Sequence, residues 1–391
     1  MKKVLAIFKA PAPYIDPLLR QFSNMPDIEL TVAYCIKTTD GEMYYDKTVG
    51  EYVKWGVRLL DGYRYLFLDE KMCEIGKSDW KIVNPNVKEL ISKNGYQIIL
   101  MGMGYWSLTT WIAIREARKN DIPVITRATV EAGRKRGKLL LLLKKIVVGR
   151  YCKYMAAGVY ECKEQKDYLL HYGMSEESLF LAPCAVDNEF FQLQSRQFSE
   201  REVRSELGIA KDKIVLVTVG MLITRKRPMD LIKACEILQK EGYDIEVFFI
   251  GDGELRGELE EHIRKSGISG IHITGRIPQN KLGEYLTAAD IYVMPSENDA
   301  SPKALNEAMN FALPIVLSSG IGTAAELLIE GENGYIYKAG DVTGLSLAIK
   351  KIIENPNRDK MGIESRNIVD KFGYGRIIEG WLMAMRYAMK N

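Results

Sequence analysis

The feature that most constrains the fold is a regular alternation of short apolar runs with longer helix-like segments along most of the chain. Short buried strands that alternate with helices predict parallel sheets covered by helices on both faces. Two such series follow one another, so we expect an α/β protein with two doubly wound, Rossmann-like domains. The predicted strands are 4–8, 29–34, 97–101, 124–127 and 155–160, then 214–219, 246–250, 271–274, 291–294 and 314–317.

The chain has 391 residues, which is enough for two domains of this kind. We expect an N-terminal domain over residues 1–190, a polar linker over 191–212 and a second domain over 213–372. The apolar helix predicted in 373–391 is expected to return to the N-terminal domain. Ligands of doubly wound sheets bind at the carboxyl ends of the strands, so we expect the two domains to face a cleft.

The composition excludes several classes of protein. The apolar run 139–143 is far shorter than the ~20 residues of a membrane-spanning helix. The N-terminus lacks the pattern of a signal peptide, so we expect a cytoplasmic protein, with peripheral attachment to the inner face of the membrane as an option. The six cysteines show no C-x-x-C spacing and there are three histidines, which argues against a disulfide framework and predicts no metal site.

Positive charge is concentrated in one stretch. Residues 115–153 contain 12 basic and three acidic residues, although the whole chain has a net charge of only +3. This stretch is either a solvated basic face or a surface for anionic lipid headgroups. No aromatic-rich binding module accompanies the charge, so we expect no nucleic-acid partner. The leucines within 134–153 suit an interfacial helix and ordinary core packing equally well.

The first junction that points to chemistry follows the strand predicted at 214–219. Gly220 ends this strand, and the cations 225–227 directly precede Pro228, which suits the first position of a helix. Cations at this positive end of the helix dipole are unfavourable unless an anion is shared. Helix amides together with Lys or Arg form a phosphate site, so we expect an anion to bind here. The alternative is a flexible loop with solvated side chains.

The second junction follows the strand predicted at 291–294. Ser301 is a good N-cap and Pro302 a good first helical residue, which would leave the amide of Lys303 facing an anion. Asp299 lies just before this helix and Glu307 lies within it. A carboxylate on each side of an anion site suits a nucleotide-sugar, with its sugar, diphosphate and ribose. The alternative is that Asp299 is only a turn residue and that Glu307 forms a surface ion pair.

Several short motifs occur in a specific order between residues 219 and 340. They are Gly220…Lys226, Ile-Gly-Asp-Gly at 250–253, Gly-Arg-Ile at 275–277, Ala-Asp-Ile at 289–291, Pro-Ser at 295–296, Asp299…Glu307, Leu-Pro at 313–314 and Gly-Glu-Asn-Gly at 331–334. This run resembles the donor domain of GT-B glycosyltransferases of family 4, the retaining glycosyl transferases group 1. The N-terminal half is more loosely similar to a subgroup from bacterial surface-polysaccharide clusters, through 55–63, 172–173 and 186–188.

The resemblance implies a role for each carboxylate. Glu307 matches the second glutamate of the family's E-x7-E motif and would bind the ribose hydroxyls. Asp299 stands where the family has the first glutamate and would face the donor sugar. The aspartate is one methylene shorter than the family's glutamate, and Glu297 is a rival for this role.

The resemblance also implies the remaining donor contacts. Lys226 follows Gly220 in the same loop and matches the diphosphate lysine, and Gly220 is expected to line the donor site. Backbone amides near Ser301 and Lys303 would hold the same diphosphate, and Ile277 would meet the base through its backbone.

One departure and the acceptor side complete the expected site. Met221 replaces the family's arginine after the glycine, and Arg225 is expected to supply that charge. The family places acceptor-side residues after the strand predicted at 124–127, which suggests Arg127 and Glu131 here. An internal ion pair is the alternative for both.

The expected activity is transfer of a sugar, with retention, from a UDP- or GDP-sugar to a hydroxyl of a carbohydrate or lipid-linked acceptor. The resemblance places it in surface-polysaccharide or glycolipid assembly, with no cofactor and no metal and with possible peripheral contact with an anionic membrane. Two alternatives stay open. One is a nucleotide-sugar isomerase or epimerase of the same architecture, and the other is a non-catalytic nucleotide-sugar-binding subunit.

Overall fold

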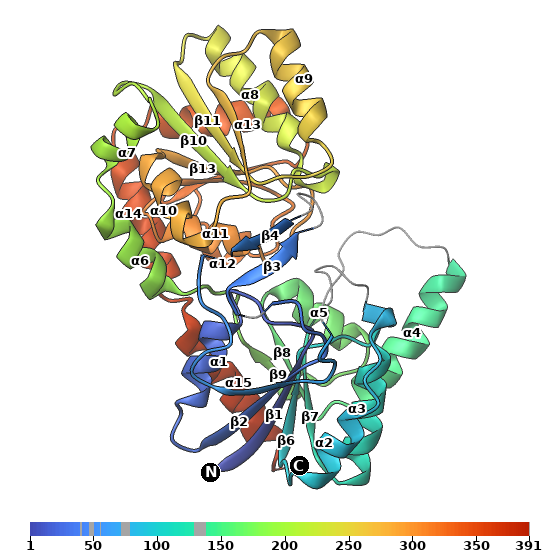
Figure 1. Cartoon of the computed structure of the whole chain (residues 1–391). Helices are drawn as coiled ribbons and strands as arrows, with labels where there is room; N and C mark the ends of the chain where they lie inside the picture. The colour runs from blue at the N-terminus through green and yellow to red at the C-terminus, as the bar shows by residue number, and fades with distance from the viewer. Residues whose placement is uncertain (40, 47–50, 55, 72–78, 129–137, 391) are drawn as a thin grey trace. The chain divides into compact units, whose positions relative to one another are not determined.

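The computed structural model describes residues 1–39, 41–46, 51–54, 56–71, 79–128 and 138–390 (Figure 1). The chain forms two compact units. Unit 1 comprises Met1–Pro183 and Tyr374–Asn391, and unit 2 comprises Cys184–Gly373. The chain therefore leaves unit 1 once and returns to it with its last helix, as the sequence predicts for 373–391.

Unit 1 is built on a seven-stranded parallel sheet in the order β5-β2-β1-β6-β7-β8-β9. Its strands are β1 Lys2–Phe8, β2 Ile28–Tyr34, β5 Arg64–Phe67, β6 Ile98–Met101, β7 Val124–Arg127, β8 Ala157–Tyr160 and β9 Leu179–Leu181, and β3 Met43–Asp46 pairs with β4 Glu51–Lys54 as an antiparallel hairpin. Its α-helices are α1 Asp16–Ser23, α2 Val87–Lys93, α3 Leu108–Lys119, α4 Lys138–Lys153, α5 Lys163–His171 and α15 Tyr374–Ala388.

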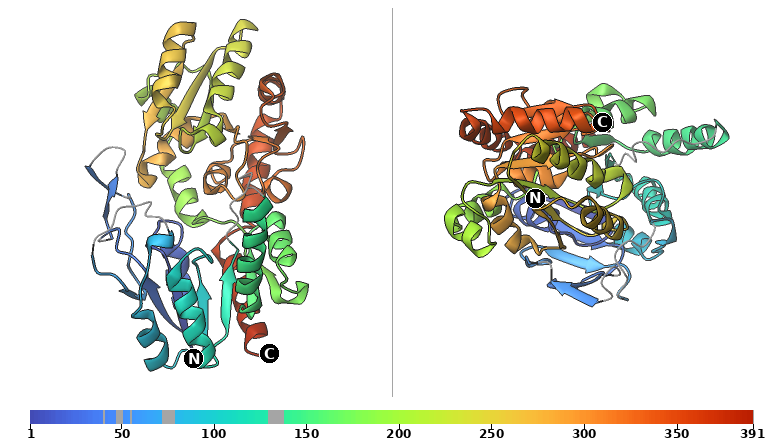
Figure 2. Two further views of the ribbon diagram at one scale, coloured as in Figure 1. Left: turned by 90° about the vertical axis from the view of Figure 1, so that its right-hand side faces the viewer. Right: turned by 90° about the horizontal axis from the view of Figure 1, so that it is seen from above.

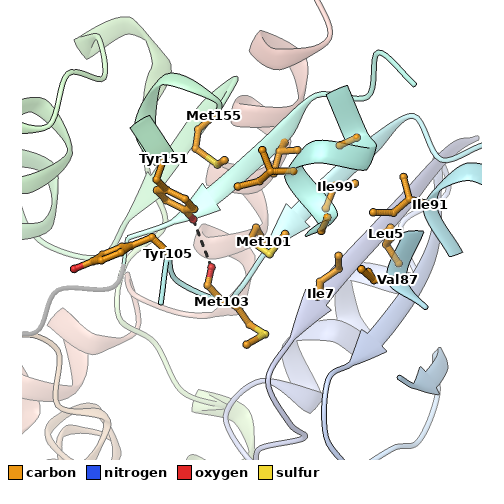
Figure 3. Close-up of a cluster of buried hydrophobic side chains, with 14 of the residues drawn as sticks. Leu5, Ile7, Val87, Ile91, Ile99, Met101, Met103, Tyr105, Tyr151 and Met155 are labelled. Carbon is orange, nitrogen blue, oxygen red and sulfur yellow. Dashed lines mark hydrogen bonds between the residues drawn. The ribbon is translucent and has the colours of Figure 1, made fainter. Parts of the chain in front are cut away.

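One core of unit 1 lies between this sheet and helices α2, α3 and α4. Figure 3 shows Ile7 of β1 and Met101 of β6 among the aliphatic side chains at its centre. Tyr151 of α4 points into the same cluster, and its hydroxyl donates a hydrogen bond to the backbone oxygen of Met103 at 3.4 Å (Figure 3). This face of α4 is therefore part of the core.

Unit 2 is built on a six-stranded parallel sheet in the order β12-β11-β10-β13-β14-β15. Its strands are β10 Ile214–Val219, β11 Ile245–Ile250, β12 Ile271–Gly275, β13 Ile291–Met294, β14 Ile315–Ser318 and β15 Gly334–Tyr337. Its α-helices are α6 Asn188–Gln197, α7 Glu200–Glu206, α8 Pro228–Lys240, α9 Arg256–Ser266, α10 Gln279–Ala288, α11 Lys303–Met309, α12 Ala324–Leu327, α13 Val342–Ile353 and α14 Arg358–Val369. Successive residues of β10 point to opposite faces of the sheet: Val215 enters one apolar cluster and Leu216 enters another. Helices therefore cover both faces of the sheet.

The strand order of unit 2 reverses at β10. The chain runs outward from β10 through β11 to β12, then crosses to β13 on the other side of β10. In doubly wound sheets, ligands bind where the order reverses, outside the carboxyl ends of the strands. The loops that follow β10 and β13 meet at this point, and they are the two junctions that the sequence singles out. The predicted α/β architecture with two doubly wound parallel sheets is confirmed.

The structure differs from the predicted linker at 191–212. This segment contains most of α6 and all of α7, and both helices pack on unit 2 through buried side chains such as Phe191 and Val203. The division between the units comes at Pro183, before the predicted boundary at 190. Within the described residues, no helix is both long and apolar enough to cross a membrane.

Candidate functional site

Glycines bring the loop after β10 into backbone contact with the loop after β11. A Cβ atom on Gly251 would lie 2.0 Å from the backbone oxygen of Gly220, and one on Gly253 would lie 2.5 Å from that of Leu222. Both distances are far below a normal contact, so these positions require glycine. The β10 loop is thereby held against its neighbour before it enters the short 3-10 helix Thr224–Lys226.

Two of the three predicted cations converge on one carboxylate. Lys226 Nζ donates a hydrogen bond to Asp299 Oδ2, and these side chains are only 15% and 17% exposed. Arg225 Nη1 lies 3.9 Å from the same oxygen and donates a hydrogen bond to the backbone oxygen of Asn298 at 3.1 Å. Two positive charges thus share a single negative one, which leaves a net positive charge where the strand order reverses.

The third cation, Arg227, takes a different direction. Its Nε donates a hydrogen bond to Asp230 Oδ2 at 2.6 Å, and its Nη1 lies 3.7 Å from Glu297 Oε2. The Glu297 side chain is 61% exposed. Asp299, rather than the rival Glu297, is therefore the carboxylate that contacts Lys226.

The backbone of Asp299 is fixed by the loop after β14. Its amide donates to the backbone oxygen of Gly320 at 2.9 Å, and the amide of Gly322 donates to the backbone oxygen of Asp299 at 2.8 Å. A Cβ atom on Gly320 would lie 2.1 Å from the backbone oxygen of Glu297, so the two loops touch directly. The sequence analysis did not assign Gly320 and Gly322 to the site, although two glycines just after a predicted strand are a usable signal.

A small cavity of ≈ 20 Å³ opens beside Lys226. Gly220 and Met221 line it from the β10 loop, and Pro295 and Ser296 line it from the β13 loop. This volume accommodates about one water-sized group. A larger ligand would therefore contact the outer surface of these loops and place at most one group in the cavity.

The helix that carries Glu307 begins one residue later than predicted. Pro302 has an extended backbone (ψ 111°) and occupies the N-cap, so α11 starts at Lys303 and has no side-chain cap. The prediction that Ser301 is the N-cap is therefore wrong, because Ser301 lies one residue before the N-cap. Lys303 Nζ donates to Cys184 Sγ at 3.1 Å, which holds this side chain against the first residue of unit 2.

Glu307 is a half-buried carboxyl group. Burial raises its pKa from 4.5 to about 7, against the opposing effects of a hydrogen bond from Gln279 and the positive charge of Lys303. Gln279 is the first residue of α10 and lies two residues after Ile277. The predicted base contact Ile277 and the predicted ribose contact Glu307 are thus brought to the same part of unit 2.

Tyr292 is a further residue of this region that the sequence analysis missed. Its ring is fully buried on β13, and its hydroxyl has no hydrogen-bond partner among the described residues. Burial raises its pKa well above 10, and the negative charges of Glu307 and Asp299 raise it further. The local sequence gives no signal for this, because an aromatic residue in a strand is ordinarily core packing.

The predicted acceptor-side residues lie in unit 1. Arg127, at the end of β7, forms an ion pair and hydrogen bond with the buried Glu161 at the end of β8. Glu131 lies outside the described residues. Arg127 also lines a small cavity of ≈ 20 Å³ at the carboxyl end of the sheet, together with Phe8 and Trp381. Among the residues that the structure describes, no three His, Cys, Asp or Glu side chains cluster to hold a metal ion.

The loops described above lie within a segment that matches a known protein family. The family model described as glycosyl transferases group 1 matches residues 199–368. This segment includes both loops and Glu307. Residues 199–368 are thus similar to a glycosyl transferases group 1 domain, and we refer to this matched segment as the group 1 domain.

Two curated relatives come from polysaccharide biosynthesis. The chain is 30% identical over 145 residues to the putative teichuronic acid biosynthesis glycosyltransferase TuaC of Bacillus subtilis. The matched segment covers 36% of this chain and 35% of that protein. The chain is also 27% identical over 191 residues to the amylovoran biosynthesis glycosyltransferase AmsK of Erwinia amylovora. This match covers 47% of this chain and 44% of that protein. The matches therefore span less than half of these relatives.

Solved structures confirm the fold over the whole chain. HepE from Anabaena, crystallised with UDP and glucose, has a TM-score of 0.73 and 16% identity, with 99% of this chain and 100% of that chain covered. Sucrose-phosphate synthase from Thermosynechococcus elongatus has a TM-score of 0.72 and 16% identity, with 99% and 98% covered. The group 1 domain and unit 1 together have the expected GT-B fold.

Proposed function

We propose that this chain is a retaining glycosyltransferase that transfers a sugar from a nucleoside-diphosphate donor to an acceptor hydroxyl. The observation that carries the proposal is the shared ion pair of Lys226 and Arg225 with Asp299, placed where the strand order of the group 1 domain reverses. A UDP-sugar is the preferred donor, because the related fold of HepE was solved with UDP and with UDP-glucose, and a GDP-sugar is the alternative.

The leaving diphosphate develops negative charge as the bond from the anomeric carbon to oxygen breaks. Lys226 and Arg225 would stabilise this charge, together with the first amides of α11 near Ser301 and Lys303. Asp299 holds Lys226 in place before the donor binds and would then face the donor sugar. Arg225 reaches the same carboxylate, so it can supply the charge that Met221 does not.

The nucleoside would lie over the other end of α11. Glu307 would accept hydrogen bonds from the ribose hydroxyls, with its side chain held by Gln279. The base would meet the backbone of Ile277. We propose that the acceptor hydroxyl attacks on the face of the sugar that the diphosphate leaves, and that the diphosphate takes its proton. The resemblance to the retaining family implies this front-face attack rather than the double displacement that two flanking carboxylates would perform.

We further propose that the acceptor is a carbohydrate or a lipid-linked saccharide, that Arg127 of unit 1 contributes to its binding, and that the product enters surface-polysaccharide or glycolipid assembly. The two polysaccharide-biosynthesis relatives support this setting. Peripheral attachment to the cytoplasmic side of an anionic membrane belongs to the same proposal. Because protein cations supply the positive charge, transfer should proceed without an added metal.

The experiment is turnover of UDP-glucose and other UDP- and GDP-sugars, followed by release of the nucleotide, with and without acceptor lipids and saccharides and in the presence of a chelator. We expect release that depends on the acceptor. Lys226→Ala should lower the rate about 10²–10³-fold, as loss of one charge-stabilising group typically does. Lys233→Gln, an exposed cation on α8, is the matched control and should be unaffected.

The outcomes separate the alternatives. Conversion of the donor sugar without any acceptor would indicate an isomerase or epimerase instead. Binding of the donor with no conversion under any condition would indicate a non-catalytic subunit. Full activity of Lys226→Ala would contradict the proposed site.

A further inference from the structure

The outer side of α3 and α4 in unit 1 carries a feature that the donor site does not use. An open crevice of ≈ 550 Å³ lies between these two helices. Trp111 and Ile114 line it with apolar surface, and five polar or charged side chains complete its wall: Arg115, Arg118, Lys119, Arg150 and Tyr154. The crevice thus combines an apolar floor with a dense group of cations.

Within the part of the chain that the structure describes, most of this positive charge has no acidic partner. Lys119 pairs with Glu116 at 3.0 Å, but Arg115, Arg118 and Arg150 form no ion pair among the described residues. The guanidinium groups of Arg118 and Arg150 lie 4.5 and 5.7 Å from the centre of the Tyr154 ring, so both are directed to one place. Helix α4 itself contains no acidic residue. An anionic partner is the simplest counterpart of such a surface.

Exposed aliphatic side chains continue this surface along α4. Leu143, Ile146 and Val147 are 51%, 60% and 40% exposed. Residues three and four apart lie on one face of a helix, so these three share a face with Arg150, which follows Ile146 by four and Val147 by three.

The opposite side of α4 packs against the core of unit 1. Val148, Tyr151 and Cys152 are buried in the core of unit 1, and Figure 3 shows Tyr151 within that core. The exposed aliphatic residues are therefore not a part of the core that happens to reach the surface. Figure 1 and Figure 2 show the first half of α4 standing away from the sheet of unit 1, which leaves this face accessible within its own unit.

We propose that this face of α3 and α4 is a docking surface for an anionic lipid bilayer. The three aliphatic side chains would enter the boundary between headgroups and acyl chains, and the arginines of the crevice would bind lipid phosphates. An interfacial helix needs both elements on one side, an apolar stripe flanked by Lys or Arg. This surface would make the peripheral membrane attachment proposed above, so the inference rests on that part of the proposed function. It uses no residue of the group 1 domain, so vesicle binding can succeed or fail separately from sugar transfer.

The test is sedimentation of the full chain with phosphatidylcholine vesicles, with and without phosphatidylglycerol. We expect binding that needs the anionic lipid and weakens with salt. Each cation near an anionic surface strengthens binding about fivefold, so Arg115→Gln/Arg118→Gln should weaken it about 25-fold. Lys233→Gln/Arg264→Gln removes the same charge from exposed positions of unit 2 and should change it less than about twofold.

A second variant tests the apolar part. Ile146→Asp places a charge on the exposed face of α4 without touching the core, and it should lower vesicle binding about tenfold or more. Circular dichroism and tryptophan fluorescence serve as checks that each variant is folded, because all five tryptophans lie in unit 1.

Three results would overturn the proposal. Equal losses in the two double variants would show attraction by net charge alone. Equal binding to vesicles without phosphatidylglycerol would show that lipid phosphate charge is not recognised. Binding of a nucleic-acid duplex that the same double variant abolishes, with no vesicle binding, would assign the surface to a different partner.

Discussion

Replacing Glu307 with glutamine should stabilise the protein in a pH-dependent way. Burial holds the pKa of this carboxyl at about 7, whereas its ordinary value is 4.5. Below about pH 4.5 the group is protonated in both the folded and the unfolded chain, so it costs nothing. As the pH rises, the unfolded chain ionises first, and the folded state loses stability until the pH passes about 7.

The expected size follows from the same two values. One pH unit corresponds to about 1.4 kcal/mol, so the ionised Glu307 costs the folded state about 2 to 3 kcal/mol near pH 8, allowing for its partial exposure. Glutamine keeps the hydrogen-bonding shape without ionising. The gain in the free energy of unfolding of Glu307→Gln should therefore be near zero at about pH 4 and reach about 2 to 3 kcal/mol above pH 7.

Urea unfolding at several pH values is the assay. Circular dichroism follows both units, and tryptophan fluorescence follows unit 1, because all five tryptophans lie in Met1–Pro183 or Tyr374–Asn391. The gain should be seen in the circular-dichroism transition. Glu258→Gln, at an exposed position of α9, is the control and should show no such trend. A gain of the same size at pH 5 and pH 8 would refute the reasoning.

Three further predictions concern packing. Gly320→Ala should destabilise unit 2 by several kcal/mol, or displace the loop of the proposed donor site and weaken UDP binding. Gly257→Ala, with open space around it, should be neutral or raise the free energy of unfolding by about 0.5 kcal/mol. Tyr292→Phe should raise the free energy of unfolding by about 1 kcal/mol, because it removes a buried hydroxyl that has no partner among the described residues. Asp16→Ala should lower the stability of unit 1 by about 2 kcal/mol or more, seen by tryptophan fluorescence, because the buried carboxylate accepts a hydrogen bond from the amide of Leu60 at 2.6 Å.

The central strands could be predicted because their sequence pattern is local. Strands such as β10 and β13 are short runs of apolar residues whose bounds, Ile214–Val219 and Ile291–Met294, agree with the prediction. The edge strands β5, β9 and β15 were not predicted. They are three or four residues long, and β15 begins with a glycine, so only their pairing with a neighbouring strand identifies them.

The prediction of a linker at 191–212 was wrong because the high charge of this segment does not mean that it is exposed. Arg204 lies in a stretch that is polar and highly charged, yet its side chain is buried. It donates hydrogen bonds to Asp290 Oδ2 at 2.8 Å and to the backbone oxygen of Ala288 at 3.0 Å. These partners lie more than 80 residues away in the sequence, so no local pattern could show that this arginine is paired inside the fold.

The sequence singles out residues of the candidate site but shows only part of how they meet. The spacing of 299 and 307 together with the family resemblance gave the two carboxylates, but the contact between Lys226 and Asp299 depends on two loops that meet only in the folded sheet. The glycine contact that fixes Asp299 also comes from a third loop. The start of α11 was predicted one residue too early: Ser301 was expected at the N-cap, which Pro302 occupies.

The central claim is that a nucleoside diphosphate binds where the loops after β10 and β13 meet in the group 1 domain. Hydrogen exchange with and without UDP tests it most directly, because it reports binding and position together. We expect slower exchange in 220–228 and 296–309, and no protection in Lys226→Ala. Protection confined to unit 1, or unchanged protection of both segments in Lys226→Ala, would contradict the claim.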